Sequence, residues 1–576
     1  MRKYKNACGL LAALALVACG EPDTVCIKMV CTSDVHGSFF PYDFIKDRPA
    51  KGSLARVSSY LKTLRTADAY GDNVVYMDNG DILQGQPTAY YYNTVNIEEE
   101  HVAAAALDYL GCDVAVLGNH DIETGGPTYQ RYANELDCDV VGANILFEDT
   151  PHTFLPPYTI VEREGVRIAV LGLTTPAIPN WLPRNLWREL EFEDMERAAR
   201  KWMEHLQQHA SPDVVVGLFH SGYEGGIVTD EYAENATRDV AVKVPGFDAI
   251  FYGHDHRARC EQVVNVEGDT VWLVNPGARA GKVATLDIAY TKGKAPKLSA
   301  ELVDMEAYEP DEAYMEQFAQ QIAQVKEYVD KKIGASACEA RAEEALYGPS
   351  GFVDFIHTMQ LDITGAQVSL AAPLAYNAML PQGDVRVRDM FDLYRYENML
   401  YVMRLTGKEI KGHLEMAYAL WTNQVVGKEK HLLRLEENVA AGARPRLEQP
   451  IYNFDSAAGI LYEVDITQPE GQKVTIRSMA DGTPFDMEAT YRVAVNSYRG
   501  NGGGELLTKG AGIPHEELEG RIDYATDVDL RFYMLNYIEM HQTIDPQPLG
   551  HWRFVPERMA AQLIEHDRKL LGTFLN

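Results

Sequence analysis

Short polar motifs in the first half of the chain place histidine, aspartate and asparagine directly after apolar runs. In chain order the motifs read TSDVHGS, DNGDILQG, GNHD, LFHSG and YGHDH. The potential metal ligands in these motifs are Asp34, His36, Asp81, Asn119, His120, Asp121, His220, His254 and His256. Imidazole, carboxylate and amide donors together suit borderline or hard divalent ions such as Zn, Mn, Co or Fe. Each motif alone is common as a turn or a helix cap, but the ordered set predicts metal chemistry.

The elements that must position these motifs follow a regular pattern. Val- and Ile-rich runs between Cys26 and Leu302 alternate with amphipathic segments. The clearest of these segments are Gly52–Arg65, Glu98–Leu110 and Met195–His209. Such alternation predicts an α/β layered domain with buried sheets. Because loops at the carboxyl ends of sheet strands build the sites of open α/β folds, we expect the five motifs to meet.

A chain of 576 residues is too long for one core, so at least two domains are expected. Apolar side chains recur every three or four positions over residues 311–333, which predicts one amphipathic helix with Gly334 as its stop. We expect this helix to connect two domains. Beyond Tyr347 the predicted elements are the helices Phe352–Gln360 and Gly407–Trp421 and the strands Leu461–Ile466 and Tyr491–Asn496.

The charge balance of the chain limits the kinds of molecule that its surface can bind. Acidic residues number 84 and basic residues 53, which gives a net charge of −31. Such a surface repels nucleic-acid polymers and anionic membranes. An anionic substrate would therefore need local positive charge, which bound metal ions can supply. No obligate protein partner is indicated. The cysteines beyond position 19 show no C-x-x-C spacing, so neither a zinc finger nor a redox pair is predicted.

The N-terminus has the form of an export signal. Three basic residues within the first five positions precede an apolar run that ends in L-V-A-C at Cys19. The run is shorter than the ~20 residues of a membrane-spanning helix. We predict a signal peptide over 1–18 and a tether over 19–25. The L-V-A-C ending resembles a bacterial lipobox, which implies a lipid on Cys19 and an outer-membrane location, facing the periplasm or the exterior. The alternative is an ordinary signal peptide with a chance cysteine.

The order and intervals of the metal motifs resemble the calcineurin-like metallophosphoesterases. They resemble in particular the exported branch that contains the 5′-nucleotidases and the 2′,3′-cyclic-nucleotide 2′-phosphodiesterase/3′-nucleotidases. The resemblance implies two divalent ions, one bound by Asp34, His36, Asp81 and His256, the other by Asp81, Asn119, His220 and His254. Two such ions clamp phosphoryl oxygens and lower the pKa of a bound water to roughly 7.

One motif histidine, His120, is left without a metal. The family pattern implies that it faces the phosphate, oriented by an acidic partner, and stabilises charge or protonates the leaving oxygen. Asp121 and Glu123 both lie within reach in the sequence, and we favour Asp121 slightly. We therefore predict His120 and Asp121 as the catalytic pair.

The resemblance also implies the architecture. It predicts a metallophosphoesterase β-sandwich flanked by helices over residues 26–305 and a helical linker over 306–345. A C-terminal α+β nucleotide-binding domain is predicted over 346–576. In that domain of the family two aromatic rings sandwich the nucleobase. Tyr396, with Asn398 beside it in Y-x-Y-x-N, and Tyr498 in VNSYRGNGGG match these positions. Core packing is the alternative for each tyrosine.

The stretch VNSYRGNGGG raises the question of whether its glycines hold a phosphate. Since the resemblance assigns the phosphate to the metal ions, we expect the glycines to turn the backbone near the nucleoside. Arg499 is expected to be an exposed loop arginine. Stacking on Tyr396 and Tyr498 would tolerate any base, at roughly 1–3 kcal/mol per stacked base.

The substrate motifs distinguish two branches. The 5′-nucleotidase pattern carries a G-G-x-R step, whereas this chain has SLAAPLAYNAML without arginine in the corresponding place. The resemblance therefore favours hydrolysis of 2′,3′-cyclic nucleotides to 3′-nucleotides and then to nucleoside and phosphate. The alternatives are a 5′-nucleotidase or UDP-sugar hydrolase, a non-catalytic surface protein that binds nucleotides, and a protein phosphatase.

Overall fold

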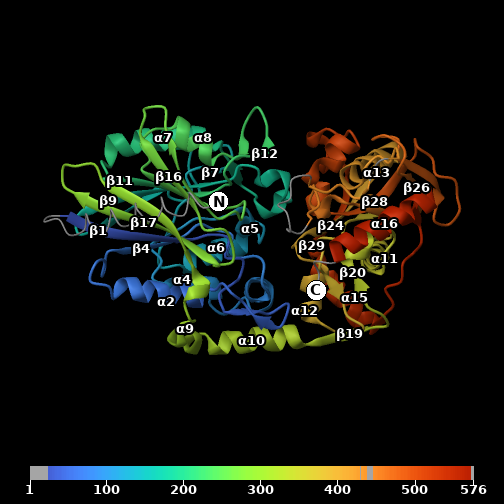
Figure 1. Ribbon diagram of the computed structural model, residues 1–576, viewed down its shortest axis with the longest axis horizontal. Coiled ribbons are helices and arrows are strands. Elements are labelled where there is room, and N and C mark those ends of the chain that lie inside the picture. The colour runs from blue at the N-terminus through green and yellow to red at the C-terminus, as the bar shows by residue number, and fades with distance from the viewer. Residues whose placement is uncertain (1–23, 428–429, 437–444, 573–576) are drawn as a thin grey trace. The chain divides into compact units, whose positions relative to one another are not determined.

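The computed structural model describes residues 24–427, 430–436 and 445–572. The predicted signal peptide and Cys19 lie outside these residues. The described chain divides into two compact units (Figure 1). The first comprises the described residues up to Pro179 with Arg184–Tyr328, and the second comprises Asn180–Pro183 with the chain from Val329 onward. Within the described ranges, none of the helices is both long and apolar enough to span a bilayer.

Two six-stranded sheets form the centre of the first unit. One has the order β18 (Lys297–Asp304), β17 (Lys282–Thr291), β1 (Thr24–Thr32), β4 (Val74–Asp78), β5 (Val114–Ala115), β6 (Asp139–Val140). The other has the order β15 (Arg259–Val264), β16 (Thr270–Asn275), β14 (Ala249–Tyr252), β11 (Val214–His220), β9 (Val166–Thr174), β8 (Tyr158–Arg163).

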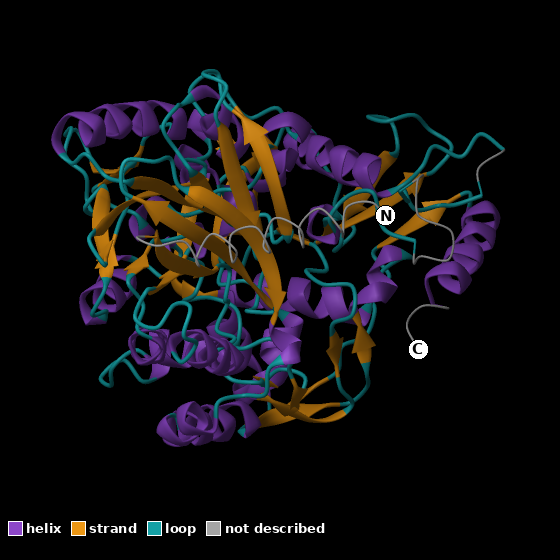
Figure 2. Cartoon of the chain, turned by 60° about the vertical axis from the view of Figure 1, so that its left-hand side comes forward, coloured by secondary structure: helices purple, strands orange, loops and turns teal. Residues whose placement is uncertain are grey.

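The inner faces of the two sheets share one hydrophobic core. Met29 and Val75 from the first sheet cluster with Val170, Leu218 and Phe251 from the second. Helices α2 (Leu54–Arg65) and α4 (Val102–Leu110) lie on one outer side, while α7 (Met195–His209) and α8 (Thr237–Lys243) lie on the other (Figure 1). Figure 2 shows the helices and strands of the chain in a view turned by 60° about the vertical axis. The predicted α/β layered fold is confirmed.

The strand directions explain how the site is assembled. β1 pairs with β4 in parallel, β4 pairs with β5 in parallel, and β11 pairs in parallel with both β9 and β14. Because parallel strands end at the same edge of a sheet, the loops after β1, β4 and β5 lie together, as do those after β11 and β14. The polar motifs occupy these loops or, for His220, the last residue of β11.

The predicted helix over 311–333 is wrong as a single element. The chain forms α9 (Glu312–Gln317) and α10 (Ala319–Asp330), separated at the buried Phe318 by a non-helical backbone. Gly334 does not end a helix, because it lies in strand β19 (Lys332–Ser336). A Cβ at Gly334 would lie 2.7 Å from the Ile538 side chain, so close packing accounts for this glycine. The apolar spacing continues through both Phe318 and Gly334, so it marks neither the break in the helix nor the strand.

Over its described residues, the second unit combines a five-stranded sheet with two three-stranded sheets and the two-stranded pair β20 (Ala340–Arg341) and β22 (Met379–Leu380). The large sheet has the order β25 (Ser456–Ala458), β21 (Val368–Ala371), β28 (Thr490–Asn496), β24 (Met399–Thr406), β29 (Ile522–Asp529). The three-stranded sheets are β27 (Val474–Met479), β26 (Ile460–Asp465), β31 (Trp552–Val555) and β23 (Gly383–Arg386), β19, β30 (Thr543–Ile544). The longer helices are α11 (Gly351–Thr364), α13 (Gly407–Trp421), α15 (Leu530–His541) and α16 (Glu557–Gly572).

Aromatic rings fill the core of the second unit. The buried Trp421 at the end of α13 stacks on Tyr418 at 4.9 Å and on Phe454 at 5.4 Å between ring centroids. Thr406 and Glu409 form a capping box that fixes the start of α13. The cap and the stacked rings therefore hold α13 at both ends.

Candidate metal centre

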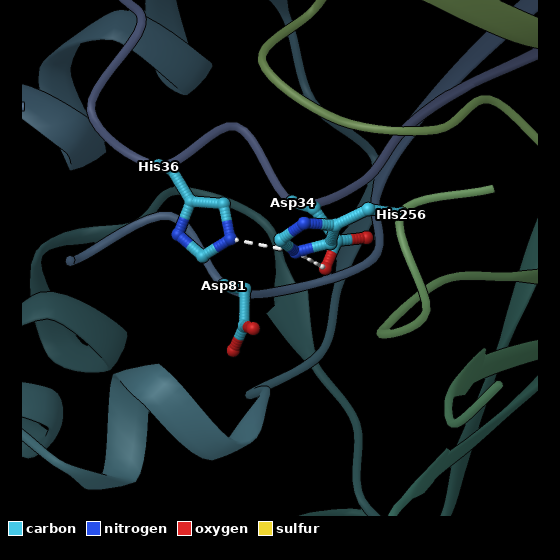
Figure 3. A group of neighbouring side chains, drawn as sticks. All are labelled: Asp34, His36, Asp81 and His256. Carbon is cyan, nitrogen blue, oxygen red and sulfur yellow. Dashed lines mark hydrogen bonds and ion pairs between the residues drawn. The ribbon is translucent and has the colours of Figure 1, made fainter. Parts of the chain in front are cut away.

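Two groups of candidate ligands meet in the first unit and share Asp81. In the first group the ligand atoms of Asp34, His36, Asp81 and His256 all lie within 4.8 Å of one another (Figure 3). In the second group the same holds for Asp81, His220 and His254. His36 Nε2 lies 3.0 Å from His256 Nε2, which lies 3.3 Å from Asp34 Oδ1. The Asn119 Oδ1 atom adjoins the second group, 2.8 Å from His254 Nδ1. The structure thus brings all seven residues together, and their role as ligands remains a prediction.

The backbone at this site is held in an uncommon conformation. Five of the seven residues have a left-handed φ: Asp34 (53°), His36 (48°), Asp81 (57°), His254 (69°) and His256 (56°). Such a conformation costs a non-glycine residue on the order of 1–3 kcal/mol, and it clusters at functional sites. Backbone hydrogen bonds between loops lock it in place, from Asp34 N to Gly80 O at 2.9 Å and from His36 N to Asp81 O at 2.9 Å.

Hydrogen bonds fix the tautomers of two histidines. His220 Nδ1 donates to the Asn79 carbonyl oxygen at 2.7 Å, and His36 Nδ1 donates to the Gln84 carbonyl oxygen at 3.0 Å. Because a carbonyl oxygen only accepts, each neutral ring keeps its Nε2 lone pair for another partner. His220 Nε2 is buried without a hydrogen bond and lies 3.2 Å from Asp81 Oδ2. A metal ion would satisfy this orphaned atom.

His254 is oriented the opposite way by a residue that the sequence motifs did not reveal. Its Nε2 faces Glu234 Oε1 at 3.1 Å, on β13 (Ala233–Asn235). Its Nδ1 therefore carries the lone pair that faces Asn119 Oδ1, which is also an acceptor. Two acceptors at 2.8 Å fit a shared cation, so the donor set suits divalent ions. Glu234 lies 20 residues before His254 and belongs to no motif, so no sequence signal marked it.

Glycines allow the ligand loops to approach closely. A Cβ at Gly118 would lie 2.2 Å from Asp81 Oδ1 and 2.7 Å from His220 Cε1. A Cβ at Gly253 would lie 2.0 Å from Ser33 Oγ and 2.5 Å from Asp34 Oδ2. The glycines of the GNHD and YGHDH motifs are therefore required by the packing around Asp34 and Asp81.

The acidic partner of His120 is Glu123, and the preference for Asp121 is wrong. His120 Nδ1 lies 2.5 Å from Glu123 Oε2. The buried Asp121 carboxylate instead accepts four backbone N–H groups, those of Asp81, Ile82, Leu83 and Gly118, at 2.8–2.9 Å. With both oxygens engaged by the backbone, Asp121 positions the loops and leaves His120 to Glu123.

Nearby carboxylates raise the basicity of His120. Burial lowers the pKa of His120, but the Asp81 and Glu123 carboxylates outweigh burial and raise that pKa to about 9. A cation held by Asp81 would cancel the contribution of Asp81, because the charge of a bound ion inverts the local electrostatics. Glu123 would then be the group that keeps His120 oriented and basic.

The candidate base-binding tyrosines lie in the second unit around a third ring. Tyr396 and Tyr498 are both half-buried, and each meets Tyr452 edge to face, with centroids 6.4 and 6.0 Å apart. Tyr452, which lies in the stretch IYNFD (residues 451–455), was not among the predicted site residues. Asn398 is buried, and its Nδ2 atom donates to the Tyr394 hydroxyl at 3.4 Å. In this structure Asn398 is therefore a buried residue that holds the segment around Tyr396 through its contact with Tyr394.

Arg499 is buried, so the prediction of an exposed loop arginine is wrong. Only 2% of its surface is exposed, and its guanidinium pairs with Asp455 through Nε at 3.0 Å and Nη2 at 3.1 Å. Nη2 also donates to the Tyr452 carbonyl oxygen at 2.7 Å. Burial raises the pKa of Asp455, but Arg499 and His413 outweigh it and lower that pKa to about 2. The arginine thus links the segments of Tyr452 and Tyr498.

The glycines after Arg499 close around this ion pair. Gly502 and Gly504 have φ values of 100° and 68°. A Cβ at Gly504 would lie 2.3 Å from Arg499 Nη1, and one at Gly503 would lie 2.6 Å from the Tyr498 ring. The GNGGG stretch is therefore shaped by packing against Arg499 and Tyr498.

The contact between Glu234 and His254 gives a direct test. Glu234→Gln removes the charge that keeps His254 Nε2 protonated and its Nδ1 basic, so we expect affinity for Mn²⁺ or Zn²⁺ to fall about 10- to 100-fold. Competition with a chromophoric chelator measures this affinity. Glu231→Gln, an exposed glutamate of the same hairpin, is the matched control and should bind metal as the parent does. Equal affinities of all three proteins would show that Glu234 does not tune the centre.

Comparison with known proteins agrees with this geometry. The calcineurin-like phosphoesterase family matches residues 27–258, and the 5′-nucleotidase C-terminal domain family matches residues 322–509. A Haemophilus influenzae protein named 2′,3′-cyclic-nucleotide 2′-phosphodiesterase/3′-nucleotidase is 27% identical, over 94% of this chain and 89% of that one. The trifunctional nucleotide phosphoesterase YfkN of Bacillus subtilis is 25% identical over 92% of this chain, which spans only 39% of its length.

Solved structures share the two-domain fold. A crystal structure described as a 5′-nucleotidase of Staphylococcus aureus has a TM-score of 0.74 at 22% identity, covering 92% of this chain and 99% of its own. A 5′-nucleotidase precursor from Thermus thermophilus has a TM-score of 0.62 at 22% identity, covering 92% of this chain and 100% of its own. The two family matches together cover most of the chain. The phosphoesterase match lies in the first unit, and nearly all of the C-terminal domain match lies in the second. This chain therefore belongs to the calcineurin-like phosphoesterases that carry a 5′-nucleotidase C-terminal domain.

Proposed function

We propose that this chain is a dinuclear-metal phosphohydrolase that converts 2′,3′-cyclic nucleotides to 3′-nucleotides and then to nucleoside and phosphate. The observation that carries the proposal is the pair of ligand groups that share the buried Asp81. The names of relatives that align over nearly their whole length, such as the H. influenzae protein, support the choice of substrate.

Seven residues would hold the ions. Asp34, His36, Asp81 and His256 form one proposed site, and Asp81, Asn119, His220 and His254 form the other. Zn, Mn, Co and Fe all suit this donor set. When bound, divalent ions supply Lewis-acid stabilisation of phosphoryl oxygens and lower the pKa of water. The chain as a whole has a net charge of −31. Two cations would supply local positive charge at the point where an anionic substrate must bind.

His120 is the proposed proton donor. Its Nδ1 is held by Glu123, so Nε2 is the atom free to give a proton to the departing ribose oxygen. In the first step water adds to phosphorus, the bond from phosphorus to O2′ breaks, and O2′ takes up a proton. In the second step the bond to O3′ breaks in the same way and phosphate is released. The same side chain thus serves both steps.

Recognition of the base is assigned to the second unit. Tyr396 and Tyr498 supply the proposed stacking surfaces, with Asn398 buried behind them. The Arg499–Asp455 pair and the edge contacts to Tyr452 hold the two tyrosine segments. Stacking uses the face of any base, so we expect broad base tolerance. The linker helices α9 and α10 join the two units in sequence.

Export and lipid attachment also remain proposals. The basic start, the apolar run and the L-V-A-C ending support a bacterial lipoprotein anchored through Cys19 to the outer membrane, facing the periplasm or the exterior.

A substrate panel tests the proposed activity. We expect the purified protein with Mn²⁺ to release phosphate from 3′-AMP. It should also release phosphate from 2′,3′-cyclic AMP, which it first opens to 3′-AMP and then hydrolyses. We expect 5′-AMP to be a poorer substrate, because SLAAPLAYNAML lacks the arginine of the 5′-nucleotidase pattern. Preference for 5′-AMP or a UDP-sugar without cyclic activity would favour the 5′-nucleotidase alternative. Nucleotide binding without any hydrolysis would favour a non-catalytic protein.

The tyrosines are tested by separating binding from chemistry. Tyr498→Ala or Tyr396→Ala should raise KM for 3′-AMP about 5- to 150-fold, which corresponds to 1–3 kcal/mol of lost stacking. The rate with glycerol 2-phosphate, which has no base, should be unchanged. Tyr524→Ala removes an exposed tyrosine of the same unit and is the matched control. An unaltered KM in both tyrosine variants would assign the two rings to packing alone.

A further inference from the structure

A second set of metal-binding side chains lies inside the second unit, in a different part of the chain from the centre described above. Asp354 and His357 on α11 and His551 just before β31 place ligand atoms within 4.8 Å of one another. All three are buried, with exposed fractions of 1%, 0% and 5%. Asp354 and His357 are three residues apart, so they lie on the same face of α11.

His551 is the member of this group whose ring nitrogens lack hydrogen-bond partners. Both of its ring nitrogens are buried without a hydrogen bond. An unsatisfied buried polar group destabilises the fold, so its presence calls for a bound water or ion. His551 Nε2 lies 3.8 Å from Asp354 Oδ1, a separation that two ligands of one ion can have. A neutral imidazole ring carries one lone pair, which can bind a metal ion.

Asp354 is a buried carboxylate that lacks a nearby lysine or arginine partner among the described contacts. Its Oδ2 atom accepts the Leu549 backbone N–H at 2.7 Å, and its Oδ1 atom faces His551. Burial raises its pKa to about 7. A buried carboxylate is costly unless it is protonated, paired or bound to a metal. A divalent cation would compensate for its charge.

His357 is already oriented as a ligand. Ser369 Oγ donates to Gln360 Oε1 at 2.7 Å, so its oxygen accepts from His357 Nδ1 at 2.8 Å. The lone pair therefore lies on His357 Nε2, which faces Ser456 Oγ at 3.1 Å. A hydrogen bond on the opposite ring nitrogen is the usual support of a metal-bound histidine. An ion bound there would take the place of the Ser456 hydroxyl as the partner of His357 Nε2.

We propose that Asp354, His357 and His551 bind one zinc ion that fastens α11 to the start of β31. Two imidazoles and one carboxylate form a zinc-type donor set, and the burial of all three leaves no position open to a substrate, as in a closed, structural site. Since β31 pairs with β26, such an ion would connect α11 to the three-stranded sheet of the second unit. The site is separate from the proposed catalytic ions, because it uses none of their ligands.

Zinc content measures the proposal directly. The full-length chain carrying Asp81→Asn, which weakens the first centre, is dialysed against micromolar zinc, and bound zinc is determined by mass spectrometry. Adding His551→Gln should remove one equivalent of zinc per chain and lower the Tm of the zinc-loaded protein. Adding His541→Gln, which changes an exposed histidine of the same unit, should remove none. Equal zinc content with and without His551→Gln would overturn the proposal.

A measurement on the unaltered protein covers the case in which the variant does not fold. Crystals of the wild-type chain grown with zinc should show an anomalous difference peak at the zinc edge between Asp354, His357 and His551. A peak without anomalous signal would identify a water there and overturn the proposal. The same crystals report the first centre separately, so the two sites are distinguished.

Discussion

One buried carboxylate holds the candidate metal-binding loops of this protein together. Asp121 accepts backbone N–H groups from Asp81, Ile82 and Leu83 after β4 and from Gly118 after β5. These bonds fix the loop on which Asp81 lies, and Asp81 in turn accepts the His120 backbone N–H at 2.8 Å. Charge-assisted bonds of this kind are about twice as strong as neutral ones. The two ligand groups share Asp81, so both depend on this contact.

The same loops carry strain that a metal would help to offset. Five candidate ligands have left-handed backbones, and the lone pair on His254 Nδ1 faces Asn119 Oδ1, a second acceptor. Neither feature is favourable in a protein without ions. Divalent cations would turn the facing acceptors into ligands, so binding free energy would offset part of the backbone strain. Residues around the centre, including Glu234 and the carbonyl of Asn79, then decide which nitrogen of each histidine is available.

Much of the fold was accessible from the sequence because its signals are local. Buried parallel strands read as continuous apolar runs, and the polar motifs follow them directly, so the seven candidate ligands could be named. The strand at Gly334 was missed because pairing with the distant β23 overrides the helical period. The break at Phe318 was missed because the apolar spacing continues through it. The role of Glu123 depends on a choice between two neighbouring acids. The role of Glu234 and the burial of Arg499 depend on contacts between segments far apart in the sequence. Periodicity carries no information about either.

The central claim is that hydrolysis needs two ions at the site that shares Asp81. The most direct measurement is a titration of the metal-free protein with Mn²⁺, following 3′-AMP hydrolysis and the electron paramagnetic resonance spectrum together. Two ions about 3.5–4 Å apart are magnetically coupled. We predict that activity rises with the coupled signal and that Asp81→Asn abolishes both. Full activity in metal-free protein, or activity that saturates while the spectrum shows isolated Mn²⁺ alone, would contradict the account.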